Sequence, residues 1–383
     1  MKARARATLI KAPRRCISLS MPVRSFRDRD FIETTEGLLM CVVGNVHPDD
    51  RVICYLKYIP GHLTSAVRTK WSRRGVIYSR ILPYYSAEGV AQVKEFLRRH
   101  YPHYLVHDEV LGIETIEVNV NCIKKHYLPE RRLKEVLRHP RDPLESMAKE
   151  MVEILSSSSG VPLEDFGITG SILLQMHNPA YSDVDLTVYG RENAYRVKET
   201  LLRLYEEENS SFRRVHGAML ESWARDIVKI HALTLAEAKK LYGYEKWNRA
   251  LFKGRQFSIH PVKKEEEVNE RYGDKVYRGV GIAKIRCQVV DSKDSIFLPA
   301  VYKVTNVIFM EGVQVKGLEE IVSYEGLYCD IAKPGEVVYA YGKVEEVIDR
   351  VSGRGYYRLV IGTYEAQGRD YLKPERWLEP SMP

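Results

Sequence analysis

The spacing of hydrophobic residues changes along this chain, and the changes divide it into three regions. In residues 22–127 apolar residues alternate over Glu114–Ile123 and recur at helical spacing over Gly89–Tyr101, which predicts a small α+β domain. From Gly279 onward the apolar runs are short, strand-like and separated by turns. A chain of 383 residues also exceeds one ordinary domain, so two or three domains are expected.

A central region lies between these two. Pro129, Pro140 and Pro143 punctuate residues 128–143, which we interpret as a linker. Residues 144–270 are expected to contain helices over Leu144–Ser156, Asn193–Glu207, Met219–Leu233 and Leu235–Arg249 and a strand over Gln256–Val262. Residues 279–375 are expected to contain strands over Ile282–Val290, Ile296–Phe309, Val337–Val344 and Tyr356–Thr363, which suit a small barrel or sandwich. The predicted fold class is therefore α+β.

The net charge of +8 is concentrated at the amino terminus. The first twenty residues hold six basic residues and no acid, so the rest of the chain has 53 bases against 51 acids. We treat residues 1–21 as a basic tail. It is interpreted as a disordered tail or a product of an upstream start codon, with a phosphate-binding arm and a transit peptide as alternatives.

Composition excludes several other classes of protein. The chain has no run of about eighteen apolar residues, so no membrane span is expected. Its six cysteines are scattered and form no C-x-x-C pair, which argues against a zinc site and favours the reducing cytoplasm.

Two aspartates indicate a metal site. Asp183 and Asp185 stand two apart in an apolar strand-like run, and the strand period of two places both carboxylates on one face. Like charges this close raise a pKa unless a cation lies between them. Hard oxygen donors at this spacing suit Mg²⁺ or Mn²⁺, which also bind nucleotide phosphates. The alternative is a hairpin in which the aspartates only cap the turn that follows Asn178.

Gly170 and Ser171 form the other half of the motif. A glycine allows the backbone to approach a phosphate closely, and a serine at a helix start offers a hydroxyl and an amide to phosphate oxygens. Phosphoryl-type transfer depends mainly on positioning and charge neutralisation, which such groups supply.

The order Gly-Ser, eleven residues, Asp-x-Asp resembles the signature of the DNA polymerase β nucleotidyltransferase superfamily. In particular, the chain resembles archaeal nucleotidyltransferases that carry this core among flanking domains. The resemblance implies that Gly170 and Ser171 hold the triphosphate of an NTP such as ATP. It implies that Asp183 and Asp185 are the catalytic metal ligands for Mg²⁺ or Mn²⁺. The implied reaction moves an NMP to an acceptor and releases pyrophosphate; the acceptor stays open among RNA, DNA, protein and small molecules.

The sequence departs from that superfamily at one position. A third carboxylate is expected on the neighbouring strand, where Ser258 and His260 stand instead. Asp226 and the acidic run Glu265–Glu267 are the nearest alternatives. Without a third ligand, the chain would be a catalytically degenerate nucleotide- or nucleic-acid-binding protein on the same core, and this is the alternative function.

Basic residues near the motif are further candidates for ligand contacts. Lys246 and Arg249 are expected to bind nucleotide, with Lys253 and Arg255 beside them, although a solvated helix end explains these cations equally well. A basic and aromatic stretch is the candidate for an RNA or other nucleic-acid contact, against the alternative of an ordinary surface loop. It consists of Arg68, Lys70, Trp71, Arg73, Arg74, Tyr78 and Arg80.

Overall fold

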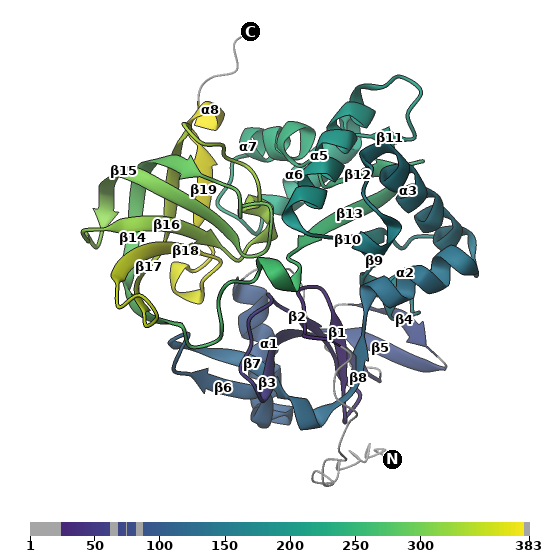
Figure 1. Cartoon of the computed structure of the whole chain (residues 1–383), viewed down its shortest axis with the longest axis horizontal. Helices are drawn as coiled ribbons and strands as arrows, with labels where there is room; N and C mark the ends of the chain where they lie inside the picture. Colours follow the sequence, from purple (N-terminus) through teal and green to yellow (C-terminus); the bar gives the residue numbers. More distant parts are fainter. Residues whose placement is uncertain (1–23, 62–67, 74, 82–86, 379–383) are drawn as a thin grey trace, which may run out of the picture.

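A computed structural model describes residues 24–61, 68–73, 75–81 and 87–378 of the chain, so the basic tail lies outside the described residues. The fold is α+β, as expected, with three sheets in three bodies that meet around a common centre (Figure 1). In the part of the chain that the structure describes, no helix is long and apolar enough to cross a membrane.

The N-terminal body is a curved eight-stranded sheet with the helix α1 (Ala87–His100). Its strand order is β4-β5-β3-β2-β1-β8, and β7 joins β6 to β3. The strands are β1 (Phe31–Thr34), β2 (Leu39–Val42), β3 (Arg51–Pro60), β4 (Arg68–Arg73), β5 (Val76–Arg80), β6 (Leu105–Asp108), β7 (Ile113–Asn119) and β8 (Ile123–Tyr127). Strand β3 alternates buried and half-buried residues, so one of its faces packs in the body while the other stays accessible.

The central body is a five-stranded sheet in the order β11-β12-β13-β10-β9. Its strands are β9 (Phe166–Ile168), β10 (Val184–Tyr189), β11 (Phe212–Arg213), β12 (Arg249–Phe252) and β13 (Arg255–Val262). Helices α2 (Pro129–Arg138), α3 (Pro143–Ser159) and α5 (Arg191–Glu206) share one hydrophobic core with this sheet. Parallel pairing of β10 with β13 forms the middle of the sheet.

Two elements of the central body differ from the expectation. Residues 128–143, interpreted as a linker, form α2 and the start of α3, because Pro129 occupies the first turn of α2 and Leu133 and Val136 enter the core. The helix expected over Leu235–Arg249 is also shorter: α7 (Leu235–Lys240) runs into a π-helical turn (Leu241–Glu245), and the chain then joins the sheet as β12. Sheet pairing of Arg249–Phe252 with β13 overrides the local helical spacing. Helix α6 (Gly217–Ile227) precedes α7.

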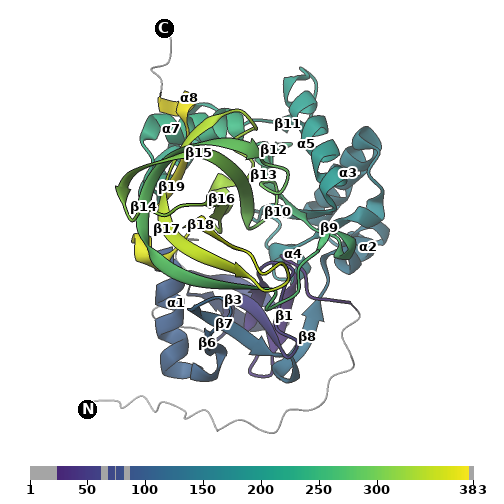
Figure 2. The same ribbon diagram turned by 60° about the vertical axis from the view of Figure 1, so that its left-hand side comes forward.

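The C-terminal body is a closed barrel (Figure 2). Its strands are β14 (Lys275–Asp291), β15 (Ala300–Gly312), β16 (Leu318–Ser323), β17 (Val337–Asp349), β18 (Gly355–Ile361) and β19 (Tyr371–Pro374), and α8 (Glu375–Leu378) follows. Strand β14 pairs with both β15 and β17, which closes the ring β14-β15-β16-β18-β17. Strands β16 and β18 pair in parallel, and β19 adds to β17. The sequence allowed either a barrel or a sandwich, and this closed ring of strands is a barrel.

Polar contacts join the barrel to its two neighbours. On the central body, Arg191 Nη2 and Lys263 Nζ lie 2.6 and 2.8 Å from the two carboxylate oxygens of Asp294, which belongs to the loop before β15. On the N-terminal body, the Tyr277 amide donates to the Val110 carbonyl at 2.9 Å. Apolar contacts join the bodies as well, because Ile296 and Phe297 before β15 enter the central core and Leu241 and Tyr242 after α7 enter the barrel core.

We expect Gly342→Ala to destabilise the barrel. Gly342 lies in β17, where an added Cβ would overlap the Val360 carbonyl oxygen of β18. Overpacking against a backbone atom costs about 3 kcal/mol, so the midpoint of thermal unfolding should fall by several degrees. Gly326→Ala is the matched control, because its added Cβ would meet nothing within 4 Å. Equal midpoints for the two variants would contradict the close packing of β17 on β18.

Candidate functional site

The two aspartates lie at the start of β10. Asp183 immediately precedes this strand, and Val184 and Leu186 are fully buried in the core. Asp183 and Asp185 therefore share the face opposite the core, as strand periodicity predicts. The turn before them is closed by other groups: the Asn178 amide donates to Ser182 Oγ at 2.9 Å, and the Ala180 amide donates to Asn178 Oδ1 at 2.9 Å. Turn capping does not explain the aspartates.

The neighbouring strand β13 places two polar side chains beside Asp185. In the parallel ladder Asp185 pairs with Ser258, and the next outward position holds His260. The Ser258 hydroxyl donates to Asp185 Oδ1 and lies 3.0 Å from His260 Nε2. His260 Nε2 lies 3.9 Å from Asp185 Oδ1. Ser258 and His260 thus occupy the place where a third carboxylate was expected.

Three of the other acids considered for that place, Asp226, Glu265 and Glu267, have partners elsewhere. Asp226 pairs with Lys229 on the exposed surface of α6 and its following turn. Glu265 accepts hydrogen bonds from Ser25 and Arg27, and Glu267 accepts the Arg191 amide at the start of α5. These contacts connect structural elements.

The two aspartates differ in pKa because their surroundings differ. The neighbouring carboxylate of Asp185, together with burial, raises the pKa of Asp183 to about 6, although Lys57 and Arg249 oppose this shift. Burial alone would raise the pKa of Asp185, yet the nearby His260, the charge of Lys57 and the hydrogen bond from Ser258 hold it below its usual range. Burial lowers the pKa of His260 to about 4, so its imidazole is neutral near pH 7.

Gly170 faces the same carboxylate. It begins the short helix α4 (Gly170–Leu173) at a φ of +64°, and an added Cβ would overlap Asp185 Oδ2. The Thr169 amide donates to the Asp185 carbonyl at 2.9 Å, which ties the motif to β10. Only a glycine allows this approach of the backbone to the carboxylate. Ser171, which is 7% exposed, follows in α4.

The N-terminal body packs directly on this helix. Leu173, Leu174 and Met176 form one apolar cluster with Phe31 and Tyr58 of the N-terminal sheet. The Thr169 hydroxyl donates to the Arg29 carbonyl at 2.7 Å, just before Gly170. The glycine-serine turn is therefore held between two bodies.

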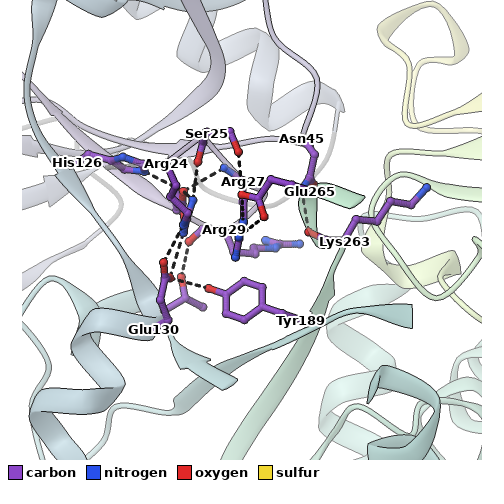
Figure 3. Close-up of polar contacts among 12 residues, drawn as sticks. Arg24, Ser25, Arg27, Arg29, Asn45, His126, Glu130, Tyr189, Lys263 and Glu265 are labelled. Atoms are coloured by element: carbon purple, nitrogen blue, oxygen red, sulfur yellow. Dashed lines mark hydrogen bonds and ion pairs between the residues drawn. The ribbon is translucent and has the colours of Figure 1, made fainter. Parts of the chain in front are cut away.

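A group of hydrogen bonds and ion pairs holds the N-terminal segment against the central body (Figure 3). Arg24 bridges Asp30 and Glu130 of α2, with Nη1 to Asp30 Oδ2 and Nε to Glu130 Oε1 both at 2.7 Å. The Tyr189 hydroxyl at the end of β10 donates to Glu130 Oε2 at 3.0 Å. Asn45 donates to the Lys263 carbonyl at 3.1 Å. These contacts fix the N-terminal sheet relative to β10.

Lys57 of β3 and Arg29 bring positive charge to the site from the N-terminal body. Lys57 lowers the pKa of both aspartates, and the charge of Arg29 contributes to the low pKa of His260, in which burial is the larger cause. Sequence reasoning missed both residues. The only signal for Lys57 is its place among the accessible positions of the alternating strand β3.

The basic residues predicted beside the motif have different roles. The exposed Arg249 of β12 stacks on Trp223 and Tyr242, with its guanidinium carbon 4.7 and 5.9 Å from the ring centres, and its charge reaches Asp183. Lys246 is buried and donates to the Gly326 and Cys329 carbonyls of the barrel at 2.6 and 3.3 Å, so its amine joins two bodies.

Lys253 and Arg255 have protein partners as well. Arg255 donates to the carbonyls of Pro179 and Ala180 at 3.0 and 2.9 Å, which supports the turn before Asp183. Lys253 pairs with Glu150 of α3.

All six predicted site residues line one cavity of about 2100 Å³ between the three bodies. They are Gly170, Ser171, Asp183, Asp185, Lys246 and Arg249. Residues of the N-terminal sheet, α6 and the barrel complete its walls, so the cavity belongs to no single body.

The basic and aromatic stretch serves mainly in packing. Trp71 and Tyr78 are buried, and Arg73 donates to Glu33 Oε2 at 2.8 Å. Arg80 lines the cavity. Arg74 lies outside the described residues, as do the side chains of Arg68 and Lys70.

A second group of potential metal ligands lies outside the cavity and consists of Asp142, Glu145 and His177. Asp142 caps α3 by accepting the Leu144 amide at 2.9 Å, and His177 Nε2 lies 2.7 Å from Asp142 Oδ2. Glu145 forms an ion pair with the buried Arg132. Each side chain already has a protein partner, so the group connects α3 to α2 and to the segment after α4.

Comparisons with known proteins identify a similar protein, but its name states no activity. The chain is similar to Uncharacterized protein MJ1086 of Methanocaldococcus jannaschii, with 29% identity over 362 residues that cover 91% of this chain and 99% of that protein. No protein-family model matches the chain, and no solved structure matches it. The similarity runs through all three bodies.

Gly170→Ala is expected to weaken divalent-metal binding at the aspartates by at least about tenfold, because the added Cβ displaces the Asp185 carboxylate. Gly160→Ala is the matched control: Gly160 has a φ of +70° and open space around its Cβ position, so it carries the backbone strain without the clash. Electron paramagnetic resonance of Mn²⁺ measures both affinities. Equal Mn²⁺ affinities in the two variants would show that Gly170 does not support metal binding at the aspartates.

Mn²⁺ affinity is also expected to rise between pH 5 and pH 7. The pKa of Asp183 is raised to about 6, and a carboxylate must lose its proton to bind a metal. Below that pKa the protonated form dominates, so the apparent affinity at pH 5 should be about tenfold lower than at pH 7. Asp183→Asn should lower the affinity and remove this pH step. A wild-type affinity that is constant over this range would contradict the raised pKa.

Proposed function

We propose that this protein is a metal-dependent nucleotidyltransferase that moves an NMP from an NTP to an acceptor hydroxyl. The observation that carries the proposal is the approach of Gly170 to Asp185 beside Asp183, inside a cavity with cations on its walls. The motif's resemblance to the DNA polymerase β superfamily supports the same reaction.

The residues present fit a divalent cation. Asp183 and Asp185 offer hard oxygen donors on one face of β10, and the raised pKa of Asp183 expresses a repulsion from Asp185 that a bound cation would relieve. These two side chains would hold the metal. When bound, the metal supplies charge neutralisation at the phosphates and polarises the reacting oxygens.

The protein's own groups account for nucleotide placement. The turn at Gly170 and Ser171 lets backbone amides approach the triphosphate, and Thr169 and Arg29 hold that turn in position. Lys57 of the N-terminal body and Arg249 of the central body add positive charge, which would offset the charge that grows on the leaving group.

In the proposed reaction the acceptor oxygen forms a bond to the α-phosphorus of the NTP. The bond from this phosphorus to the oxygen bridging to the β-phosphorus breaks, and pyrophosphate leaves with the bonding electrons. The proton of the acceptor hydroxyl passes to solvent. The five cysteines of the described residues are free, which fits a reducing cytoplasm as the place of this reaction.

His260 favours Mn²⁺ over Mg²⁺ at this site. Its imidazole is neutral near pH 7 because burial lowers its pKa to about 4, so Nε2 can bind a metal once the ring proton that now faces Ser258 is carried by Nδ1 instead. A nitrogen donor is softer than the carboxylate it replaces and is less suited to Mg²⁺.

A second candidate function follows from the same substitution. Ser258 and His260 stand where a third carboxylate would help to activate the acceptor. A protein with this site could bind nucleotide and nucleic acid without transferring the nucleotide. The experiment below separates the two functions.

Label transfer from each of four α-³²P-labelled NTPs tests the proposal, with total RNA and the protein itself as acceptors. Wild type should transfer label with Mn²⁺ and more slowly with Mg²⁺, whereas Asp183→Asn with Asp185→Asn should transfer none. Ser258→Asp, which places a carboxylate directly beside Asp185, should raise the rate with Mg²⁺.

One combination of results would contradict the transferase function. If wild type and Ser258→Asp both transfer no label, while nucleotide binding survives the loss of both aspartates, the binding function replaces the transferase.

A further inference from the structure

Two loops of the barrel bring acidic side chains together at the cavity. The first loop follows β16, and its residue Glu325 lies half-buried on the cavity wall. The second loop follows β18, and its Gly362 and Thr363 amides donate to the carboxylate of Asp370, which is 5% exposed. The loops adjoin each other, since an added Cβ at Gly362 would lie 3.2 Å from Glu325 Cγ. Both acidic side chains therefore contact the same turn.

These two carboxyls differ from their acidic neighbours because no cation is paired with them. Glu345 and Glu365 line the same part of the cavity, and both form ion pairs with Lys343, at 3.2 and 2.8 Å. Among the residues that the structure describes, no Lys, Arg or His forms an ion pair with Glu325 or Asp370. Burial, followed by the charge of Asp370, raises the pKa of Glu325 to about 8. A partly desolvated carboxyl of this kind is stabilised in its charged form by a cation.

Uncharged polar groups without partners lie beside the two carboxyls. In the described part of the chain, the Tyr328 hydroxyl and Thr363 Oγ1 are buried and have no hydrogen-bond partner. Burial and the charges of Glu325 and Asp370 raise the pKa of Tyr328, so its hydroxyl lies near both carboxyls. Buried polar groups are nearly always hydrogen-bonded. Two unpartnered hydroxyls beside two unpaired carboxyls therefore indicate a site for a ligand.

The end of α6 contributes a further acceptor and an apolar surface. The His231 ring lines the cavity and lies edge-on to the Tyr328 ring, with 6.4 Å between the ring centres. Burial lowers the pKa of His231 to about 4, so its imidazole is neutral near pH 7 and one ring nitrogen can accept a hydrogen bond. Ile227 and Ile230 line the cavity next to it along the chain.

These groups fit an organic ammonium better than a metal ion. Among the described residues, Asp142, Glu145 and His177 are the one group of three or more potential metal ligands that lie within 4.8 Å of one another. The acids and the histidine on the barrel side are therefore too far apart for a compact metal site. An alkylammonium carries one positive charge and three N–H donors, which match a carboxylate and several neutral acceptors. Its hydrocarbon chain can lie against Ile227 and Ile230.

We propose that the barrel side of the cavity binds a primary alkylammonium ligand, with the ammonium nitrogen among Glu325, Thr363 and Tyr328. Glu325 supplies the countercharge, and the two hydroxyls and the His231 ring accept the N–H groups. The site is formed by two barrel loops and the end of α6, so it does not depend on the proposed transferase function.

Calorimetry with butylamine on the full chain tests the proposal. Glu325→Gln keeps the size of the side chain and removes its charge, so it should weaken butylamine binding at least about tenfold. Thr363→Val and Tyr328→Phe each remove one neutral acceptor and should weaken binding by about threefold. Glu346→Gln is the matched control, because Glu346 is a half-buried glutamate of β17 that does not line the cavity. Thermal unfolding shows that each variant is folded.

Binding of the amine should also release a proton. With a pKa of about 8, Glu325 is about nine-tenths protonated at pH 7, and a bound ammonium favours its charged form. Calorimetry in buffers of different ionisation enthalpy should therefore detect close to one released proton per butylamine at pH 7, and almost none at pH 9. Glu325→Gln should lose this release.

Other ligands and variants separate the possible outcomes. Butanol, which has the same chain without the charge, should not bind, and tetramethylammonium, which has no N–H donor, should bind more weakly than butylamine. Absence of butylamine binding at about 10 mM overturns the proposal, as does equal affinity in wild type and Glu325→Gln. Asp183→Asn with Asp185→Asn should bind butylamine as wild type does. Loss of binding in that double variant would place the amine at the aspartates and overturn the assignment to the barrel loops.

Discussion

Strands β10 and β13 pair in parallel over six residue pairs in the middle of the central sheet, and the candidate site is built on this ladder. Val184, Leu186, Phe257 and Ile259 anchor the ladder in the core. The residues that alternate with them point to the opposite face of the sheet. They are Asp183, Asp185, Ser258 and His260. A shift of register by one residue would exchange the two faces and bury the carboxylates. Burial of apolar side chains therefore fixes the position of the polar groups.

The remaining bodies complete the site from outside the central sheet. The N-terminal sheet covers α4 with an apolar cluster and brings Lys57 and Arg29 toward the aspartates. The barrel is joined by polar contacts such as Lys246 to the Gly326 carbonyl. Interfaces between domains of one chain are commonly more polar than cores. The arrangement encloses a shared cavity, and the central and barrel cores exchange apolar side chains at their border, with Ile296 and Phe297 in the central core and Leu241 and Tyr242 in the barrel core.

The electrostatic arrangement at the aspartates depends on Ser258 and His260 of the neighbouring strand, which carry no negative charge. A third negative charge would raise the repulsion within the group. A hydroxyl donor and a neutral imidazole instead keep Asp185 ionised, while its charge and burial raise the pKa of Asp183. The two aspartates thus differ in proton affinity although they stand on one strand. This difference makes the charge of the site change with pH near the pKa of Asp183, which is about 6.

Local sequence patterns were sufficient for those features that depend on neighbours along the chain. The period of two placed Asp183 and Asp185 on one face, and helical spacing identified α3 and α5, because both patterns express burial of one side of a single element. The α+β class and the departure at Ser258 and His260 could also be predicted. The resemblance to DNA polymerase β and the activity it implies remain a proposal.

Contacts between distant segments were decided only by the tertiary structure. Nothing near Lys57 in the chain indicates that β3 faces β10, and nothing near Lys246 indicates that its amine binds carbonyls of the barrel. Contacts between distant segments also decide the closure of β14 on β17 and the early end of α7. Strand pairing and packing between segments far apart in sequence outweigh local propensity, and a single sequence carries no direct signal of which segments will meet.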